Sequence, residues 1–130
     1  MDFDLNIDNI KDTEIRKSNI HGWGLYSLTN IAINTVLCEL DGQIVPYSTY
    51  SENEKTLEWN ALENDMLLVR PYRTKYSFIN HSRTPNAKIA YKPIRVICIK
   101  SIDKDEEITI DYRMEALPEK YLQGHGKTYL

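Results

Sequence analysis

Residues 77–86 read SFINHSRTPN, and this stretch says more about the fold than any other in the chain. Two Asn, one His and one Pro fall within the seven residues 80–86, which makes a polar and conformationally restricted segment. Strand-like apolar stretches flank it, and polar segments between strands commonly form binding sites. The alternative is a turn held by its Asn side chains, in which the glycosylation-like Asn80-His81-Ser82 has no functional meaning.

Two further segments combine polar residues or glycine with strand-like neighbours. The sequence HGWGLY at residues 21–26 contains a Gly-x-Gly, which taken alone is usually a turn that needs a positive φ. The sequence DEEITIDY at residues 105–112 begins as an acidic turn and continues as a strand that ends on Tyr112. Neither segment identifies a function by itself.

Short β-favouring stretches fill most of the chain, and none reaches ten residues. Gly and Pro are scattered, so no linker or internal repeat divides the 130 residues. Strands are expected at residues 14–17, 25–28, 36–40, 43–45, 66–69, 87–91, 95–99 and 108–112. The chain is therefore predicted to form a single, mainly β domain over residues 1–130.

One short helix is expected in the middle of the chain. Residues 51–54, Ser-Glu-Asn-Glu, have the form of a capping box, and Leu57, Ala61 and Leu62 can share one helical face. A second, weaker helix or turn is expected over residues 117–123.

Composition excludes several classes of protein. No apolar run approaches the roughly 20 residues of a membrane-spanning helix, and the acidic residues 1–5 do not begin a secretory signal, so a cytoplasmic or nuclear protein is expected. Cys38 and Cys98 stand far apart, and the three histidines lack the close spacing of a zinc site. Neither a disulfide framework nor a bound metal is predicted.

Basic residues are concentrated in residues 70–100, which contain eight Lys or Arg and no Asp or Glu. A nucleic-acid-binding surface is one interpretation. Because these residues alternate with apolar strand positions and no nucleic-acid-binding motif accompanies them, we favour solvated strand faces or contact with an anionic small molecule.

The order of the three segments resembles that of the SET-domain protein lysine methyltransferases. Gly-x-Gly at residues 22–24 precedes Asn-His-Ser-x-x-Pro-Asn at 80–86 and Glu-Glu-Ile-Thr-Ile-Asp-Tyr at 106–112, and residues 41–44 match the family's second, looser motif. The resemblance runs from about residue 14 to Tyr112. In size the chain is similar to the compact stand-alone SET proteins of viruses and bacteria.

The resemblance implies a particular architecture. Several small β-sheets are expected, with residues 80–86 and the strand that ends on Tyr112 forming a pseudoknot. Residues 48–76 would be an insert that helps to recognise substrate, and residues 113–130 a C-terminal tail. The family's C-terminal cysteine cluster is absent, so residues 117–130 of this tail are the candidate to cover the adenine and complete the substrate channel; the alternative is a disordered tail.

The resemblance also implies an activity and a set of ligands. Methyl groups would be transferred from S-adenosyl-L-methionine to a lysine side chain of a protein substrate such as a histone, without membrane association and with nucleic acid involved only through a chromatin-type substrate. A dedicated general base is not required, because the cofactor's positive charge and an apolar channel lower the lysine pKa from about 10.4. The alternatives are a catalytically silent SET-fold binding module and, less favoured, a nucleic-acid-binding domain.

Specific residues follow from the motif match. Tyr112 would be catalytic and would also contact the cofactor. Asn80 would hold its methionine end, and backbone groups of His81 its adenine. Three further residues would line the cofactor pocket through their backbones: Gly22, Trp23 and Gly24.

The substrate channel is where this sequence departs most from the family. Leu40 and Ile110 stand where the family often has aromatic residues, which favours addition of more than one methyl group because an apolar pocket does not retain the water that blocks further transfer. Tyr91, near the end of a neighbouring strand, is a third channel candidate that could restore the restriction. Ser77 and Arg83 also depart from the family pattern, at positions expected to be peripheral.

Overall fold

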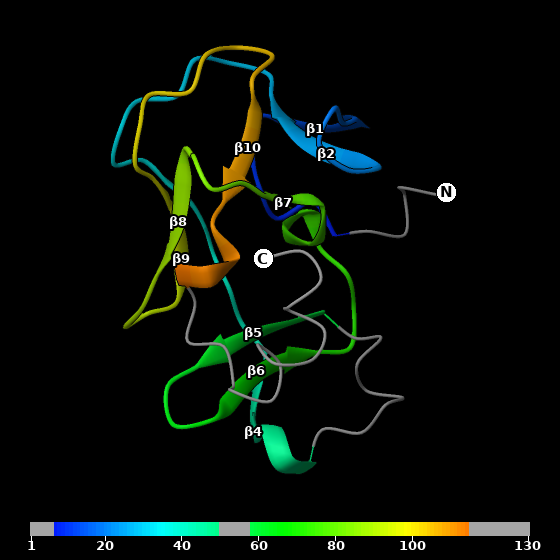
Figure 1. The fold of residues 1–130 in the computed structure, drawn as a ribbon, viewed down its shortest axis with the longest axis vertical. Helices are drawn as coiled ribbons and strands as arrows, with labels where there is room; N and C mark the ends of the chain where they lie inside the picture. The colour runs from blue at the N-terminus through cyan, green and yellow to red at the C-terminus, as the bar shows by residue number, and fades with distance from the viewer. Residues whose placement is uncertain (1–6, 50–57, 115–130) are drawn as a thin grey trace.

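The computed structural model describes residues 7–49 and 58–114, and in this part of the chain ten strands form three small sheets (Figure 1). The prediction of a mainly β fold with several small sheets is therefore confirmed. The first sheet has the order β1 (Thr13–Lys17), β2 (Trp23–Ser27), β10 (Glu107–Ile110) and β7 (Asn80–His81). The second has the order β3 (Val36–Glu39), β9 (Arg95–Cys98) and β8 (Ala87–Ala90), and the third β4 (Gln43–Pro46), β6 (Met66–Arg70) and β5 (Glu58–Leu62).

Strand β10 lies at the centre of the first sheet. It pairs antiparallel with β2 and parallel with β7, where Thr109 faces Asn80 and Ile110 faces His81. The side chain of Asn86 extends this pairing, because its amide donates to the Glu107 carbonyl at 2.8 Å and accepts from the Thr109 N–H at 2.9 Å. The two segments expected to meet in a pseudoknot thus lie against each other.

The helix expected after Ser51 is wrong where it can be compared with the structure. Ala61 and Leu62 belong to strand β5, which pairs with β6 through a tight hairpin. Residues 63–65 form the turn, in which Asn64 and Asp65 have φ values of 61° and 56°, a conformation that Asn and Asp adopt more readily than most residues. Residues 51–57, the helix or turn predicted over 117–123 and the tail beyond residue 114 lie outside the described residues.

Three short 3₁₀ turns complete the described chain: η2 (Tyr47–Thr49), η4 (Lys75–Phe78) and η5 (Tyr112–Met114). The sequence pattern predicts a strand that ends on Tyr112, but strand β10 ends at Ile110. This early end puts Tyr112 on a turn, where its side chain no longer follows the alternation of the strand.

The largest hydrophobic core joins the first two sheets. Leu25 and Ile108 contribute to it from the first sheet and Val96 from the second, together with the two free cysteines, Cys38 and Cys98. The third sheet has a smaller core of Ala61, Leu67 and Val69. Among the described residues, no helix has the length and apolar character needed to cross a membrane.

A buried ion pair holds the third sheet to the segment that follows it. Arg70, 1% exposed, donates to the carboxylate of Glu58 and, at 2.8 Å, to Asn60 Oδ1. The same carboxylate accepts hydrogen bonds from Thr74 and Ser77 at the start of η4. Burial alone would raise the pKa of Glu58, but these hydrogen bonds and the charge of Arg70 outweigh it and lower that pKa.

Candidate functional site

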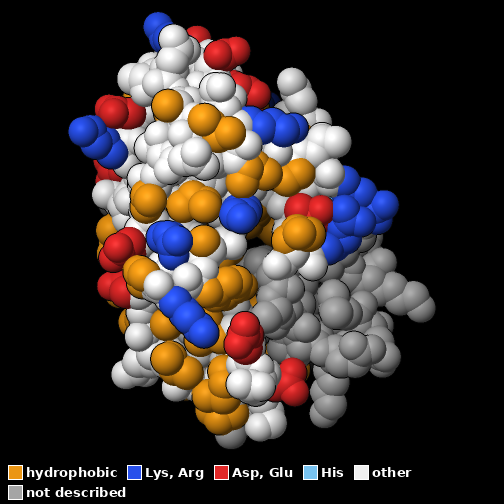
Figure 2. Space-filling model, turned by 90° about the vertical axis from the view of Figure 1, so that its left-hand side faces the viewer, with side chains coloured by type: hydrophobic (Ala, Val, Ile, Leu, Met, Phe, Trp, Pro, Cys, Tyr) orange, Lys and Arg blue, Asp and Glu red, His pale blue; other side chains and the backbone are white. Residues whose placement is uncertain are grey.

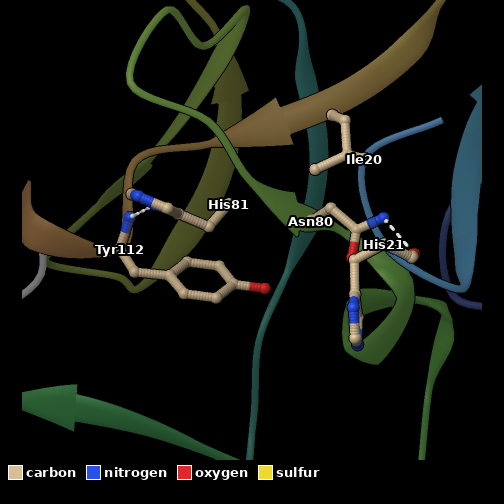
Figure 3. Close-up of a pocket in the computed structure, with 5 residues that line it drawn as sticks. All are labelled: Ile20, His21, Asn80, His81 and Tyr112. Carbon is tan, nitrogen blue, oxygen red and sulfur yellow. Dashed lines mark hydrogen bonds between the residues drawn. The ribbon is translucent and has the colours of Figure 1, made fainter. Parts of the chain in front are cut away.

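A pocket of about 500 Å³ opens beside the first sheet, between the β1–β2 loop and the residues around β7. Ile20 and His21 of the loop lie with Asn80 on one side of it, and His81 and Tyr112 lie on the other (Figure 3). The structure thus brings together three of the residues that the sequence predicted for one site. Sequence reasoning assigned no role to Ile20 and His21, although His21 is the first residue of the segment 21–26 that contains the Gly-x-Gly.

The loop at residues 18–22 is folded around Ser18. The Ser18 N–H donates to the Gly22 carbonyl at 2.8 Å, and the Ser18 hydroxyl accepts from the Ile20 N–H at 2.9 Å. Gly22 has a φ of +45°, which a glycine adopts without the steric cost that a Cβ would add. This compact loop places Ile20 and His21 at the pocket.

The side-chain amide of Asn80 joins the loop to β7. Its Nδ2 lies 3.1 Å from the carbonyl oxygens of both His21 and Trp23, 3.2 Å from Ser18 Oγ and 2.9 Å from Glu107 Oε2. Four oxygens around one amide group identify the nitrogen, because an amide oxygen in that place would be repelled by the two carbonyls and the carboxylate. With Nδ2 held by these four oxygens, the Asn80 Oδ1 is the acceptor at the other position of an amide that lines the pocket.

Glu107 is a residue of this site that sequence reasoning missed. Its carboxylate accepts from the Ser18 hydroxyl at 2.7 Å and from the Tyr26 hydroxyl at 3.1 Å, in addition to Asn80. Burial and the hydrogen bond to Glu107 raise the pKa of Tyr26. A Cβ at Gly24 would overlap this carboxylate, coming within 2.8 Å of its Cδ, so the second glycine of the Gly-x-Gly makes room for Glu107.

Tyr112 is held at both ends by residues of the β7 segment. Its hydroxyl donates to the Ile79 carbonyl at 2.5 Å, and its backbone N–H donates to His81 Nδ1 at 3.0 Å. Figure 3 shows the Tyr112 ring extending across the pocket toward the side where Asn80 and His21 lie. Because the hydroxyl proton is bonded to a carbonyl, the oxygen's lone pairs can accept from a further group.

His81 is in its neutral form in this arrangement. An Nδ1 that accepts from Tyr112 carries no proton, so the ring proton is on Nε2. Burial lowers the pKa of His81, and Arg113 and Arg83 lower it further, while Asp111 opposes them. Asp111 lies 3.7 Å from Nδ1, but its carboxylate is already paired with the Arg113 guanidinium at 2.6 Å.

The other predicted site residues lie outside the described lining of this pocket. Leu40 and Ile110 are buried in the largest core, at 6% and 1% exposure, and the Tyr91 hydroxyl donates to the Ala61 carbonyl at 3.3 Å. Gly22 and Trp23 follow the lining residue His21 in the chain without being among the lining residues, and Trp23 is 40% exposed. The part of these residues in a substrate channel or in cofactor binding stays a prediction.

Neither a metal site nor a basic groove stands out in the described chain. His, Cys, Asp and Glu form no cluster of three or more there that could hold a metal ion. Within the basic stretch, Arg70 is buried, Lys75 donates to the Thr13 carbonyl at 2.8 Å and Arg95 to that of Pro93 at 2.8 Å. On the face shown in Figure 2, Lys and Arg side chains are dispersed among hydrophobic and acidic ones, which does not favour nucleic-acid binding.

Comparison with known proteins gives one family. The SET domain model matches residues 22–113. A histone-lysine N-methyltransferase of Emericella nidulans, described as specific for lysine 4 of histone H3, is 32% identical over 81% of this chain and 10% of its own length. The Caenorhabditis elegans histone-lysine N-methyltransferase set-2 is 33% identical over 79% of this chain and 8% of its own length. The chain therefore spans about a tenth of the length of these curated relatives.

Proposed function

The chain belongs to the SET-domain family, and we propose that it transfers methyl groups from S-adenosyl-L-methionine to a lysine side chain of a protein. The observation that carries this proposal is the pocket that Asn80 and Tyr112 both line, with the Tyr112 ring extending toward Asn80 (Figure 3). Its volume of about 500 Å³ is within the usual range for a nucleoside-sized ligand. The acceptor at Asn80 Oδ1 suits the ammonium group at the methionine end of such a cofactor.

The chemistry proposed for the chain's own residues is mainly positioning. The cofactor, when bound, supplies a methyl group activated by its positively charged sulfur. Asn80 would hold the methionine end, and backbone groups of His81 and of residues 22–24 would hold the rest. The Tyr112 hydroxyl donates a hydrogen bond to the Ile79 carbonyl. Its oxygen lone pairs would then be available to the polarised methyl hydrogens and to the substrate amine.

The substrate lysine must lose its proton before it can react. A free lysine has a pKa of about 10.4, and an apolar channel lowers it because burial disfavours the charged form. Positioning of two reactants can then account for much of the rate enhancement without a general base. We propose that residues 48–76, which include β5 and β6, contribute to the recognition of the substrate.

The first substrate to test is histone H3, because the relatives are described as acting on it. The chain is incubated with S-adenosyl-L-methionine labelled in its methyl group and with intact H3, or with H3 whose lysine 4 is replaced by alanine. We expect label on intact H3 and a strong reduction on the altered histone. Equal label on both proteins would show that lysine 4 is not the target. If histones are the substrate, we expect the protein to act in the nucleus.

A second experiment separates the enzyme from a silent binding module. Isothermal titration with S-adenosylhomocysteine measures whether the pocket binds the cofactor's adenosyl and amino-acid parts. Binding together with turnover supports the proposed function. Binding without turnover on histones or on a whole-cell extract would favour the binding module, and the absence of binding would contradict both.

A further inference from the structure

The backbone N–H of Tyr112 donates its hydrogen bond to a side chain, whereas the N–H of a residue within a strand pairs with a backbone carbonyl of the neighbouring strand. Parallel pairing of β10 with β7 ends at Ile110 and His81, where the Ser82 N–H donates to the Ile110 carbonyl at 2.9 Å. Past this point the chain turns into η5, and the Tyr112 N–H donates to His81 Nδ1 at 3.0 Å. At the point where the chain leaves the sheet, the imidazole of His81 therefore accepts the hydrogen bond that a backbone carbonyl would accept within a β-ladder.

The His81 contact is one of the contacts that hold Tyr112 in place. Another is the hydrogen bond from its hydroxyl to the Ile79 carbonyl, at 2.5 Å. Both partners come from the three residues 79–81, so the backbone and the hydroxyl of Tyr112 are hydrogen-bonded to the same short segment. The two rings also lie close, with centroids 5.2 Å apart.

We propose that the His81 imidazole is a positioning residue for Tyr112, acting as a neutral hydrogen-bond acceptor that keeps the tyrosine hydroxyl at the pocket. This inference rests on the proposed function, because it gives the position of Tyr112 a catalytic meaning. It differs from the family resemblance, which assigns only backbone groups of His81 to the adenine.

Protonation would convert the contact from attraction to repulsion. A charged imidazole carries a proton on both nitrogens, and an Nδ1–H pointing at the Tyr112 N–H leaves that donor without an acceptor. The charged groups around the ring are Asp111 and Arg113 from the β10–η5 side and Arg83 from the loop that follows β7. His21 lines the same pocket from the β1–β2 loop.

Two substitutions at His81 separate positioning from a general structural role. His81→Asn puts an amide oxygen where Nδ1 stands, so it keeps the acceptor but cannot become charged in this pH range. His81→Leu fills similar space without an acceptor. At about pH 8 we expect His81→Asn to keep most of the kcat and His81→Leu to lose it by about 10–100-fold, with a smaller effect on the dissociation constant for S-adenosylhomocysteine.

The pH dependence provides a second readout. The ratio of kcat in His81→Asn to kcat in the unmodified protein should rise as pH falls below about 6.5, because only the unmodified protein loses its acceptor. Titration of the substrate lysine affects both proteins equally and cancels in this ratio. His81→Asn as inactive as His81→Leu, or His81→Leu with full kcat, would overturn the inference.

A measurement on the unmodified protein covers the case in which a variant does not fold. Nitrogen-15 NMR distinguishes a protonated from an unprotonated ring nitrogen, and we expect His81 Nδ1 to be unprotonated at about pH 7.5, with the Tyr112 amide signal following the titration of the ring. A proton on Nδ1 in an active methyltransferase would overturn this inference alone. A protein without methyl transfer would refute the proposed function, and with it the role of His81 in positioning a catalytic Tyr112.

Discussion

At Gly24 the absence of a side chain is explained by a neighbour rather than by a ligand. A Cβ there would overlap the Glu107 carboxylate, which accepts hydrogen bonds from Ser18, Tyr26 and Asn80. The two positions of the Gly-x-Gly therefore require glycine for different physical reasons. Gly22 needs its backbone conformation, with φ +45° and no heavy atom within 4 Å of a built Cβ, whereas Gly24 needs the space.

Gly24→Ala should destabilise the protein by about 1–3 kcal/mol and weaken cofactor binding, because the new methyl group displaces Glu107 from its three donors. Gly22→Ala is the matched control, with a cost of about 1–2 kcal/mol from its backbone alone. Double variants that add Glu107→Asp to Gly24→Ala or to Gly22→Ala distinguish the two causes. The shorter aspartate relieves the overlap at residue 24 and should recover free energy of unfolding only in the Gly24→Ala pair. Urea unfolding measures this, and equal coupling in both pairs would contradict the explanation.

Tyr112→Phe should abolish most methyl transfer and leave the affinity for S-adenosylhomocysteine nearly unchanged. The hydroxyl donates to the Ile79 carbonyl at 2.5 Å and faces the pocket, whereas the ring and the backbone contact to His81 remain in the variant. Loss of this hydrogen bond should lower stability by only about 1 kcal/mol, so the folded population is preserved. Turnover assays beside isothermal titration test the prediction, and full turnover in the variant would remove Tyr112 from the catalytic role.

The number of methyl groups added is also a question of single residues. Leu40 and Ile110 are apolar and buried, and neither can hold a water in a substrate channel by hydrogen bonding. The Tyr91 hydroxyl donates to the Ala61 carbonyl. We therefore expect the enzyme to proceed beyond monomethyl-lysine, and Tyr91→Phe to give the same products. Mass spectrometry of a substrate peptide at excess enzyme decides this, and an unmodified enzyme that stops at one methyl would contradict it.

At the level of residues, the motifs named residues that the structure places around one pocket, and contacts between distant residues were missed. Asn80, His81 and Tyr112 were named, and the structure places them around one pocket. Glu107 was missed, because a glutamate in an acidic turn looks solvated until its three donors from elsewhere in the chain are known. His81 was assigned only a backbone role, since no sequence pattern shows that its ring accepts from Tyr112.

At the scale of elements, strands with alternating or continuous apolar residues were predicted to within about two residues. Strand β5 was missed because Glu58 and Asn60 are polar yet buried, and the partner that allows their burial, Arg70, lies on the next strand. Strand β7 was missed because two residues, Asn80 and His81, carry no periodicity at all. Both errors have the same physical origin, which is that a long-range partner outweighed local preference.

The Arg70–Glu58 pair gives a prediction at this scale. Arg70→Met should destabilise the protein by about 3–5 kcal/mol, because it leaves the Glu58 carboxylate buried without its cation. Adding Glu58→Gln should recover part of the loss, since a neutral amide still accepts from Thr74 and Ser77. Denaturant midpoints of the two single variants and the double variant test this, and simple additivity would show that the charge of Glu58 is not the cause.

Over the whole molecule, the site exists because distant segments meet in one sheet. Asn80 contacts Ser18 and Glu107, which lie 62 and 27 residues away in the chain. The order of motifs along the sequence predicted that the segments around Asn80 and Tyr112 meet, and the structure places both at one pocket. Their geometry was not predictable, because it depends on parallel pairing of β7 with β10 and on the early end of β10.

The pH dependence of stability is the prediction that involves the whole fold. His81, Glu58 and Asp111 all have pKa values lowered by folding, the first by burial, the second by hydrogen bonds and Arg70 that outweigh burial, and the third by the Arg113 hydrogen bond. For each group the unfolded chain binds more protons at acid pH, so stability is fully present above the unfolded pKa and is lost as pH falls through the folded one.

We therefore expect two separate losses of stability on acidification. The first begins near pH 6.5, the ordinary value of His81, and the second near pH 4.5, the ordinary value of Glu58, with Asp111 following from 3.8. Urea midpoints measured from about pH 8 to pH 3 should decrease in these two ranges. His81→Asn should abolish the first decrease and keep the second, because the two groups lie on different sheets. A midpoint that rises between pH 6.5 and pH 5 in the unmodified protein would mean that His81 gains a proton on folding, in contradiction to its role as an acceptor for Tyr112.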